Sequence, residues 1–391
     1  MHPARTPARE SRTGPHGPEA LPILLLMAVT SPWSQTVAAF LARAGHEVHV
    51  LDVNDAGEAP AARAAVETAA RSLAPVVASI HVLRGPRWLP ARLLAGALTL
   101  RRLARRHRAR AVFTLYGGLQ GAIAWLSRVR PYGVHLVGSD ILLADAPRRL
   151  VARIALAGAD LVVANGAHLA TETRRIAPGV PVQLLYFGID RERFQRQVPL
   201  DVAPRFVCAR AFAPIYDNDT IIRALARLGS PPDGFIFRFL ADGPGLDASI
   251  ARADERLGPE MRRRLVFRGG TSGRELVEGL LDARFYVSAA HSDGSSSSLL
   301  EALASGLFPI LTDIPANREW ITHGETGLLF PAGDADALAD HLRLAMRGIP
   351  WHAAAVQRNL AAVAARGDMS VNLDRLRELL VRAAARTNPA P

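Results

Sequence analysis

Lysine is absent from this 391-residue sequence, so all 47 of its basic residues are arginines. The absence excludes chemistry that depends on a lysine amine: a Schiff base with pyridoxal phosphate, the lysine of a Walker phosphate-binding loop and a lysine general base. Hydrophobic residues make up 49% of the chain. That content and this length are enough for two domains with packed cores.

Cysteine and long apolar runs are also scarce. Cys208 is the only cysteine, which excludes an internal disulfide, and the apolar run 205–209 around it predicts a buried strand residue. No apolar run reaches the roughly 18–20 residues that span a bilayer. Residues 1–20, rich in Pro, Arg and Gly, predict a disordered tail. With the apolar run 21–29 they resemble a signal peptide, but the helical pattern that follows favours a first strand and a cytoplasmic protein.

Acidic residues are absent between Glu67 and Asp140, a span with twelve of the arginines in a chain of net charge +11. Such a field favours an anionic partner. Within it, the segment 90–110 mixes arginines with leucines at positions 93, 94, 98, 100 and 103 and predicts a basic amphipathic helix. This helix face is either solvated or makes a peripheral contact, through the 84–110 region, with the anionic inner face of a membrane. No nucleic acid partner is expected, because few aromatic residues lie among the arginines.

Apolar runs of strand length alternate with segments of helical periodicity along the chain. Strands are predicted at 22–28, 47–52, 76–83, 111–115, 134–137, 161–164 and 182–186. After a linker at 188–204 the alternation restarts, with strands at 205–209, 235–240, 265–268, 284–289 and 307–312. The pattern predicts an α/β fold of two Rossmann-like, doubly wound parallel-sheet domains, at 21–198 and 199–347, that face a cleft.

The segment 285–306 holds the densest group of candidate ligand-binding residues. An apolar strand runs into a Gly/Ser loop, and the loop opens a helix that carries Glu301, eight residues after Asp293. The free N–H groups and the positive dipole at a helix start attract phosphate. Four serine hydroxyls add hydrogen-bond donors. Phosphates at the helix start and sugar hydroxyls at the carboxylates would suit a nucleotide-sugar.

Several motifs, in order along the chain, resemble the family 4 retaining glycosyltransferases of the GT-B fold. They lie at 160–194, 241–245 (Ala-Asp-Gly-Pro-Gly), 266–269 and 324–331, and the pair Asp293 and Glu301 resembles the family's Glu-x7-Glu motif. The resemblance covers roughly residues 21–385. It implies that the helical segment 348–391 packs back on the N-terminal domain. It also implies transfer of a sugar from a nucleotide-diphosphate sugar to an acceptor hydroxyl.

The resemblance assigns roles to individual positions on the donor side. Asp293 matches the carboxylate beside the transferred sugar, and Glu301 matches the one that holds the ribose hydroxyls, so both are the expected catalytic residues. Arg210 matches the arginine that neutralises the diphosphate. The remaining expected donor-binding residues lie in loops that receive the diphosphate or line the nucleotide: Gly243, Gly269, Ser295, Ser296, Ser297, Ser298 and Leu299.

On the acceptor side the resemblance is weaker. Gly138 and Asp140 match a Gly-x-Asp loop of the N-terminal domain that faces the cleft. Val137 replaces the histidine that often precedes this loop. His135, two residues earlier, is the alternative acceptor-side residue, because side chains two apart on a strand point the same way. A core histidine is the other interpretation of His135.

Two further departures concern charge. Asp293 replaces the usual glutamate, which keeps the charge on a shorter side chain. Tyr216 stands where a lysine normally follows the arginine, so Arg210 is expected to carry more of the phosphate charge. The run Asp217-Asn-Asp219 resembles a metal-binding motif of the other glycosyltransferase fold, but it precedes a helix, where Asp219 is a natural N-cap. No metal or other cofactor is therefore expected.

These features predict a metal-independent, retaining glycosyltransferase of polysaccharide or glycoconjugate biosynthesis. Its acceptor is a glycan, a glycolipid at the membrane surface or a small molecule. Two alternatives stay open: a catalytically silent protein that binds nucleotide-sugars, and a nucleotide-sugar epimerase, which needs no acceptor. A phosphorylase-like enzyme is excluded, because the chain has no lysine to anchor pyridoxal phosphate.

Overall fold

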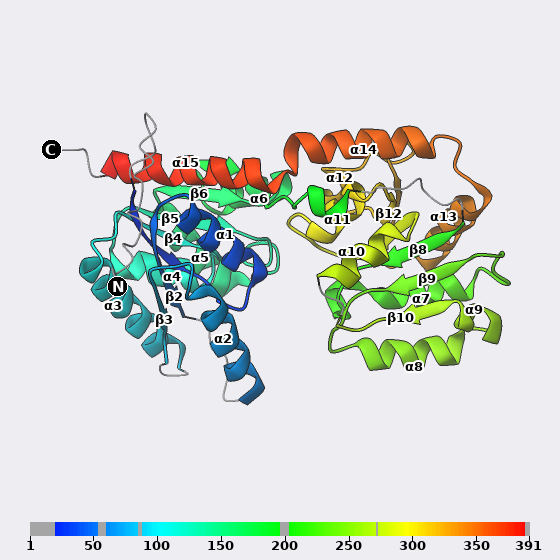
Figure 1. Ribbon diagram of the computed structural model, residues 1–391, viewed down its shortest axis with the longest axis horizontal. Helices are drawn as coiled ribbons and strands as arrows, with labels where there is room; N and C mark the ends of the chain where they lie inside the picture. The colour runs from blue at the N-terminus through cyan, green and yellow to red at the C-terminus, as the bar shows by residue number, and fades with distance from the viewer. Residues whose placement is uncertain (1–19, 54–59, 85–87, 196–202, 271–272, 388–391) are drawn as a thin grey trace, which may run out of the picture.

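The computed structural model describes residues 20–53, 60–84, 88–195, 203–270 and 273–387. They form two α/β domains side by side, and two C-terminal helices run along one side of both (Figure 1). Residues 1–19 of the predicted tail and the predicted boundary between residues 198 and 199 lie outside the described residues. Within the described ranges, no helix is long and apolar enough to cross a bilayer.

A seven-stranded parallel sheet, in the order β3-β2-β1-β4-β5-β6-β7, forms the first domain. Its strands are β1 (Pro22–Leu26), β2 (Glu47–Asp52), β3 (Ser79–Val82), β4 (Ala111–Thr114), β5 (Tyr132–Leu136), β6 (Leu161–Ala164) and β7 (Val182–Leu184). The helices between them are α1 (Pro32–Arg43), α2 (Pro60–Leu73), α3 (Leu89–Arg106), α4 (Leu119–Ser127), α5 (Ala146–Ala157) and α6 (Ala167–Ile176). This confirms the predicted doubly wound sheet.

The sheet is covered on both faces, which explains why β1 is an unbroken apolar run. Successive side chains of a strand point to opposite faces. Accordingly, Ile23 and Leu25 enter a core shared with α1 and α2, whereas Leu24 and Leu26 enter a core shared with α3, α4, α5 and α6. The helices α3 to α6 therefore form one layer on a single face of the sheet.

The second domain is built on a six-stranded parallel sheet in the order β10-β9-β8-β11-β12-β13. The strands are β8 (Arg205–Cys208), β9 (Ile236–Phe239), β10 (Leu265–Phe267), β11 (Phe285–Ser288), β12 (Phe308–Thr312) and β13 (Leu328–Phe330). Its helices are α7 (Asn218–Ala226), α8 (Leu246–Arg256), α9 (Pro259–Arg263), α10 (Arg274–Leu281), α11 (Ser297–Ala304), α12 (Pro315–Arg318) and α13 (Ala335–Arg347). Cys208 is fully buried, as predicted. The alternation of the sequence thus restarts as a second doubly wound sheet.

The last two helices divide between the domains. The first, α14 (His352–Arg366), packs Ala355 and Val363 into cores of the second domain. The second, α15 (Met369–Thr387), packs its apolar stripe into the core of the first domain, through Leu373, Leu376, Leu380 and Ala384. The return that was expected for 348–391 as a whole therefore begins only at Met369.

Element boundaries differ from the prediction where local hydrogen bonds compete with the apolar pattern. The strand expected from residue 76 begins only at Ser79, because the amides of Val76 and Val77 donate to the carbonyl of Leu73, at 3.0 and 3.3 Å, and close a turn after α2. The helical pattern after the first strand becomes a helix that begins at Pro32, because the hydroxyl of Ser31 accepts the amide of Ser34 as an N-cap. Pattern alone locates the elements but misses these capping contacts.

A carboxylate of the second domain holds the start of a helix in the first. Glu319, directly after α12, accepts hydrogen bonds from the amides of Ala167 and His168 at 2.9 and 2.6 Å, at the N-terminus of α6. The hydroxyl of Tyr186 donates to the same carboxylate at 3.1 Å. The ring of Trp320 packs against that of Tyr186 with centroids 4.9 Å apart. A negative charge at the positive end of α6 thus joins the two domains.

Replacing Glu319 with alanine should weaken this junction. The amides at the start of α6 would lose their acceptor, so the free energy of unfolding should fall by about 1–2 kcal/mol, and small-angle scattering should show a more open molecule. The matched control is Glu325→Ala, which removes an exposed carboxylate whose ion pair with Arg358 spans 3.7 Å. Equal losses of stability in the two variants would contradict the role given to Glu319.

Candidate functional site

The strand order of the second sheet reverses at β8. Strands β9 and β10 lie on one side of it and β11, β12 and β13 on the other. The loops that leave the carboxyl ends of β8 and β11 therefore diverge, which is where doubly wound sheets bind their ligands. The first loop carries Arg210 and the second carries Asp293 and the serine run. The sheet thus brings together residues that are 83 positions apart in sequence.

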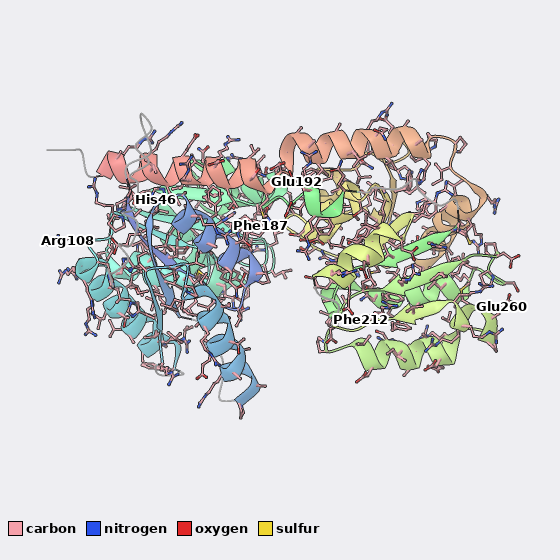
Figure 2. All side chains as sticks on the ribbon, viewed as in Figure 1. His46, Arg108, Phe187, Glu192, Phe212 and Glu260 are labelled. Atoms are coloured by element: carbon pink, nitrogen blue, oxygen red, sulfur yellow. The ribbon has the colours of Figure 1, made fainter. Side chains whose placement is uncertain are left out.

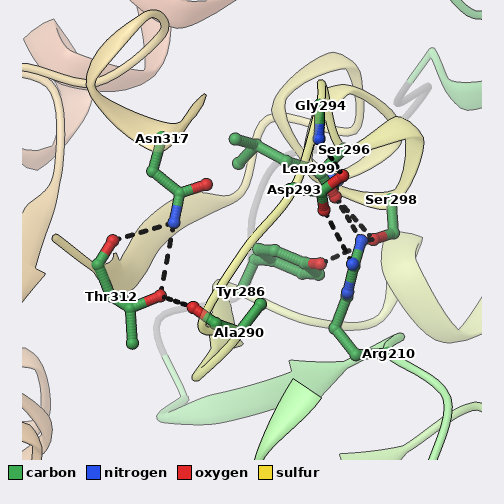
Figure 3. A network of polar contacts seen from close by, with 10 residues as sticks. All are labelled: Arg210, Tyr286, Ala290, Asp293, Gly294, Ser296, Ser298, Leu299, Thr312 and Asn317. Atoms are coloured by element: carbon green, nitrogen blue, oxygen red, sulfur yellow. Dashed lines mark hydrogen bonds and ion pairs between the residues drawn. The ribbon is translucent and has the colours of Figure 1, made fainter. Parts of the chain in front are cut away.

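Arg210 is the centre of a polar network at this point (Figure 3). One guanidinium nitrogen donates to the hydroxyls of Ser296 and Ser298, at 2.6 and 3.1 Å, and another pairs with the carboxylate of Asp293 at 2.7 Å. Only 9% of the Arg210 side chain is exposed. Burial lowers its pKa, but the charge of Asp293 together with Tyr286, Tyr216 and Cys208 raises it, so the pKa ends above its ordinary value and Arg210 remains a cation.

Neighbouring side chains fix the position of Arg210. The amide of Asn218 donates to the backbone carbonyls of Arg210 and Ala211, both at 3.2 Å. The ring of Tyr216 lies under the guanidinium, which is 4.0 Å from the ring centroid. Tyr216 stands where the sequence comparison expects a lysine, so a cation–π contact takes the place of a second charge. The hydroxyls of Tyr286 and Ser298 are also 2.8 Å apart.

Helix α11 begins within this network. The Ser296 hydroxyl is its N-cap and accepts the amide of Leu299 at 3.2 Å. Ser297 and Ser298 form the first turn, where backbone N–H groups have no partner within the helix. The buried hydroxyl of Ser295 also has no hydrogen-bond partner among the described residues. A buried cation, two amides and the helix dipole together are chemically suited to an anion of phosphate type.

The two predicted carboxylates have different environments. Both oxygens of Asp293 are engaged: one accepts the amide of Gly294 at 2.9 Å and the other pairs with Arg210. Glu301, one turn into α11, is half-buried. Burial raises the pKa of its carboxyl from 4.5 to about 7, against the opposing charges of Arg193 and Arg210. A ligand group that supplies hydrogen-bond donors to Glu301 would favour its ionised form.

Arg193 is a cation of this site that sequence reasoning missed. It lies in the short helix η1 (Glu192–Phe194) of the interdomain segment, is exposed to solvent and acts on the charge of Glu301. Its guanidinium lies 3.7 Å from the point that a Cβ on Gly273 would occupy. The charged run 191–196 was the available signal, but it was assigned to a linker. With Arg193 present, Arg210 is not the only cation near the carboxylates.

The two predicted glycine loops lie at the ends of neighbouring strands. Gly243, after β9, has φ 150°, and a Cβ there would lie 2.6 Å from the amide nitrogen of Phe212. The loop of Gly243 therefore packs directly on the loop that follows Arg210. Gly269, after β10, is exposed and lies against Leu246. It extends the same edge of the sheet without contact to the arginine network.

The first domain contacts this loop through Gly138, as the resemblance implies. A Cβ on Gly138 would lie 3.0 Å from the amide nitrogen of Gly294, and a Cβ on Gly294 would collide with the carbonyl oxygen of Val137. Figure 2 shows Phe187 and Phe212 on the sides by which the two domains face each other. The residue after Asp293 is therefore in direct contact with the first domain.

Asp140 does not face an acceptor. Its carboxylate is 5% exposed and accepts the amides of Gly117, Gly138 and Val137 at 2.8, 2.9 and 3.2 Å. Burial raises the pKa of this carboxyl, although the amides oppose the shift. Asp140 thus ties the loops after β4 and β5 together and holds Gly138 in place. Its part in the site is structural.

His135 does not lie on the acceptor side either. It is 1% exposed in β5, with the ring of Phe187 at 4.8 Å and that of Trp33 at 6.0 Å between ring centroids. Burial lowers its pKa to about 3, so the imidazole is neutral. Residues two apart on a strand do share a face, but β5 is a central strand of the sheet. Its side chains are therefore covered on both faces.

The run 217–219 has structural partners throughout. Asp217, rather than the predicted Asp219, is the N-cap of α7 and accepts the amide of Thr220 at 3.2 Å. Asp219 forms ion pairs with Arg223 and Arg252, at 3.3 and 2.9 Å. Across the part of the chain that the structure describes, no group of three or more His, Cys, Asp or Glu side chains is placed to hold a metal ion.

A cavity of about 1530 Å³ lies elsewhere, between α1 of the first domain and the segment from α14 to α15. Arg43, Arg191 and Asp368 are among its lining residues. None of the predicted site residues lines it. The cavity therefore lies beside the interdomain segment and is not part of the arginine network.

Family comparisons agree with the geometry. The family model described as Glycosyltransferase Family 4 matches residues 34–193, and the one described as Glycosyl transferases group 1 matches residues 203–347. The chain is 33% identical over 143 residues to a GDP-mannose-dependent alpha-mannosyltransferase of Mycobacterium tuberculosis, a match that covers 33% of this chain and 38% of that protein. It is 31% identical over 197 residues to the lipopolysaccharide core biosynthesis mannosyltransferase LpsB of Rhizobium meliloti, covering 46% and 55%. The matches span less than two thirds of either relative.

Among solved structures, HepE of Anabaena in complex with UDP is similar to the chain. The TM-score is 0.72 at 16% sequence identity, and the match covers 93% of this chain and 100% of that one. This likeness shows a shared fold.

Glu301→Gln should remove a pH dependence of stability. The unfolded chain releases the Glu301 proton near pH 4.5, whereas the folded protein holds it to about pH 7. The stabilisation from the retained proton is complete below pH 4.5 and is lost as pH rises through 7. Glutamine has no such proton, so the variant should exceed the parent by on the order of 2 kcal/mol above pH 7 and match it in acid.

Urea unfolding at a series of pH values measures this difference. Glu278→Gln is the matched control, because Glu278 is an exposed carboxylate paired with Arg274 at 2.6 Å. A stability difference for Glu301→Gln that does not change with pH would show that burial does not raise the pKa of Glu301.

Proposed function

This chain belongs to the family 4 glycosyltransferases of the GT-B fold, and from that premise we propose that it moves a sugar from a nucleotide-diphosphate sugar to an acceptor hydroxyl. Retention of the anomeric configuration and independence of metal are part of the proposal. They rest on the resemblance of 285–306 to the family's carboxylate motif.

The observation that carries the proposal is the buried Arg210 at the start of α11. In the reaction the bond between the anomeric carbon and the diphosphate oxygen breaks, and negative charge builds on the leaving diphosphate. Arg210 and the amides of Ser297 and Ser298 lie together at the switch point of the sheet and are placed to stabilise that charge. Because Asn218 and Tyr216 already fix Arg210, little reorganisation is needed.

Glu301 is proposed to hold the ribose of the donor. Its half-buried carboxyl lies one turn further along α11 than the proposed phosphate site. Two ribose hydroxyls would donate to it and offset the cost of its charge, so donor binding should be coupled to loss of the Glu301 proton. The Asp293 carboxylate, held by Arg210, would lie beside the sugar.

GDP-mannose is the first donor to test. Both curated relatives are mannosyltransferases by name, and one is named as GDP-mannose-dependent. UDP-glucose is the second, because HepE was solved with UDP-glucose and has the same fold. The loops at Gly243 and Gly269, which are proposed to line the nucleotide, would distinguish a guanosine donor from a uridine donor.

The experiment combines donor binding with transfer. Calorimetry of the purified chain with each donor, with and without EDTA, should find one nucleotide that binds, and EDTA should have no effect. Arg210→Gln should weaken that binding by at least tenfold, because a hydrogen bond to a charged group contributes about 1.5–3 kcal/mol. Arg256→Gln, an exposed arginine at the end of α8, is the control.

Labelled donor with glycan and lipid acceptor fractions then separates the alternatives. Labelled product with release of the free nucleotide supports the transferase, and its anomeric configuration tests retention. Interconversion of the donor sugar without acceptor would indicate an epimerase. Binding without turnover on any acceptor would indicate the silent binding protein.

Gly294→Ala should impair turnover more than donor binding. The added Cβ collides with the carbonyl oxygen of Val137, so the first domain must move away from the residue next to Asp293. A misplacement of about 1 Å can lower a rate by on the order of 10²-fold, and we expect kcat/KM to fall by that amount. Gly258→Ala is the control, because nothing lies within 4 Å of its added Cβ. Unchanged turnover in Gly294→Ala would show that this contact is not needed.

A further inference from the structure

The outer layer of the first domain presents one continuous surface. Helices α3, α4 and α5 cover the same face of the sheet, with α4 packed between the other two. Gly96 of α3 lies against Ile123 of α4, and Gly121 of α4 lies against Ala155 of α5. Their sides away from the sheet therefore share one solvent-facing surface, which we call the α3–α5 face.

Large apolar side chains gather on the α3–α5 face. Leu94 and Leu98, one turn apart on α3, are 61% and 55% exposed, and Leu150 and Ile154, one turn apart on α5, are 58% and 39% exposed. Trp125 adds a ring at the end of α4. In the described part of the chain, every other exposed large hydrophobic residue also lies between positions 82 and 154, except Leu344 and Val371. Such a concentration marks an interaction surface.

Unpaired positive charge surrounds these apolar side chains. Arg101, Arg102 and Arg105 lie on the exposed side of α3, and Arg149 and Arg153 lie on the exposed side of α5. None of these five arginines forms an ion pair with a described residue. Asp145 is the N-cap of α5, and its carboxylate lies 3.9 Å from Arg148. The acid-free span between Glu67 and Asp140 thus becomes a cationic surface.

We propose that the α3–α5 face docks on the surface of an anionic lipid bilayer. Its arginines would bind lipid phosphates while Leu94, Leu98, Leu150 and Ile154 enter the boundary of the acyl chains, as in interfacial amphipathic helices. A nucleic acid would leave these aliphatic side chains in water, because single strands bind through aromatic stacking. Residues 85–87 of the predicted 84–110 contact lie outside the described residues.

The loop before α5 links the α3–α5 face to the site. Leu143, 51% exposed, is five residues after Gly138, which touches the loop that follows Asp293. An acceptor hydroxyl presented by a lipid would therefore lie near the junction of the two domains. Arg108, just after α3, lies on the side of the first domain that is remote from the second (Figure 2). The docking surface goes beyond the proposed transfer and does not depend on it.

Co-sedimentation of the full chain with vesicles tests the proposal. One set contains phosphatidylglycerol in phosphatidylcholine and the other contains phosphatidylcholine alone. We expect binding to the anionic vesicles that weakens with salt, because the Debye length falls from about 30 Å at 0.01 M to about 10 Å at 0.1 M. We expect at least tenfold weaker binding to the neutral vesicles.

Two combined variants separate the contributions of charge and of apolar contact. The first is a triple variant with Arg101→Ser, Arg102→Ser and Arg105→Ser. It should weaken binding to anionic vesicles on the order of 100-fold, since each arginine near the surface contributes about fivefold. The second is a triple variant with Leu94→Ser, Leu98→Ser and Ile154→Ser. It should weaken vesicle binding at every salt concentration. The matched control changes exposed residues of the second domain, with Arg256→Ser, Arg263→Ser and Leu344→Ser, and should bind like the parent.

Absence of binding to anionic vesicles at low salt would overturn the proposal, as would variants of the α3–α5 face that bind like the parent. Arginine-dependent binding of an RNA oligonucleotide without vesicle binding would overturn it in favour of a nucleic acid surface. The nucleotide-dependent thermal shift of each variant serves as the folding control. Because that shift reports on the site at Arg210, it also separates failure of docking from failure of the proposed function.

Discussion

A buried cation constrains the second domain. A guanidinium taken out of water costs several kcal/mol unless charges and hydrogen bonds compensate it. Arg210 obtains that compensation from Asp293, Ser296 and Ser298, which all belong to the loop that opens α11. The need to satisfy one side chain therefore ties the carboxyl end of β8 to that of β11. A phosphate that binds there would meet a cation already held in place.

The same physical rule governs how the two domains meet. Glu319 of the second domain satisfies the amides at the start of α6, and Asp140 satisfies amides from two loops of the first. Both carboxylates are used to hold backbone, and neither belongs to the polar network around Arg210. Gly138 and Gly294 then allow the two backbones to touch without side chains between them.

The inner edge of the first domain and its outer helical layer differ in the residues they expose. Its inner edge is closed by tight backbone contacts and by the aromatic cover of Trp33 and Phe187 over His135. Its outer helical layer exposes leucines beside arginines that form no ion pair with a described residue, although burying the leucines would be favourable in water.

The sequence by itself determined the two doubly wound sheets, the residues at the carboxyl ends of their strands and the approximate positions of most elements. These follow from local rules, because apolar periodicity and helix-start chemistry involve residues within a few positions of one another. That is why Asp293 and the serine run could be singled out from the residues alone, whereas Arg210 was assigned through the family resemblance. The short elements α9, α12 and β13 were not predicted, because packing rather than a sequence pattern fixes them.

Only the tertiary structure decided which polar groups are free to act. Asp140 was expected on the acceptor side, and His135 was left open between that side and the core, but Asp140 is held by three amides and His135 is covered by aromatic rings. Arg193 was assigned to a linker and lies beside Glu301. The layer of α3, α4 and α5 joined apolar stripes that are some fifty residues apart. Burial and partnership depend on contacts between distant segments, and no local pattern in a sequence records them.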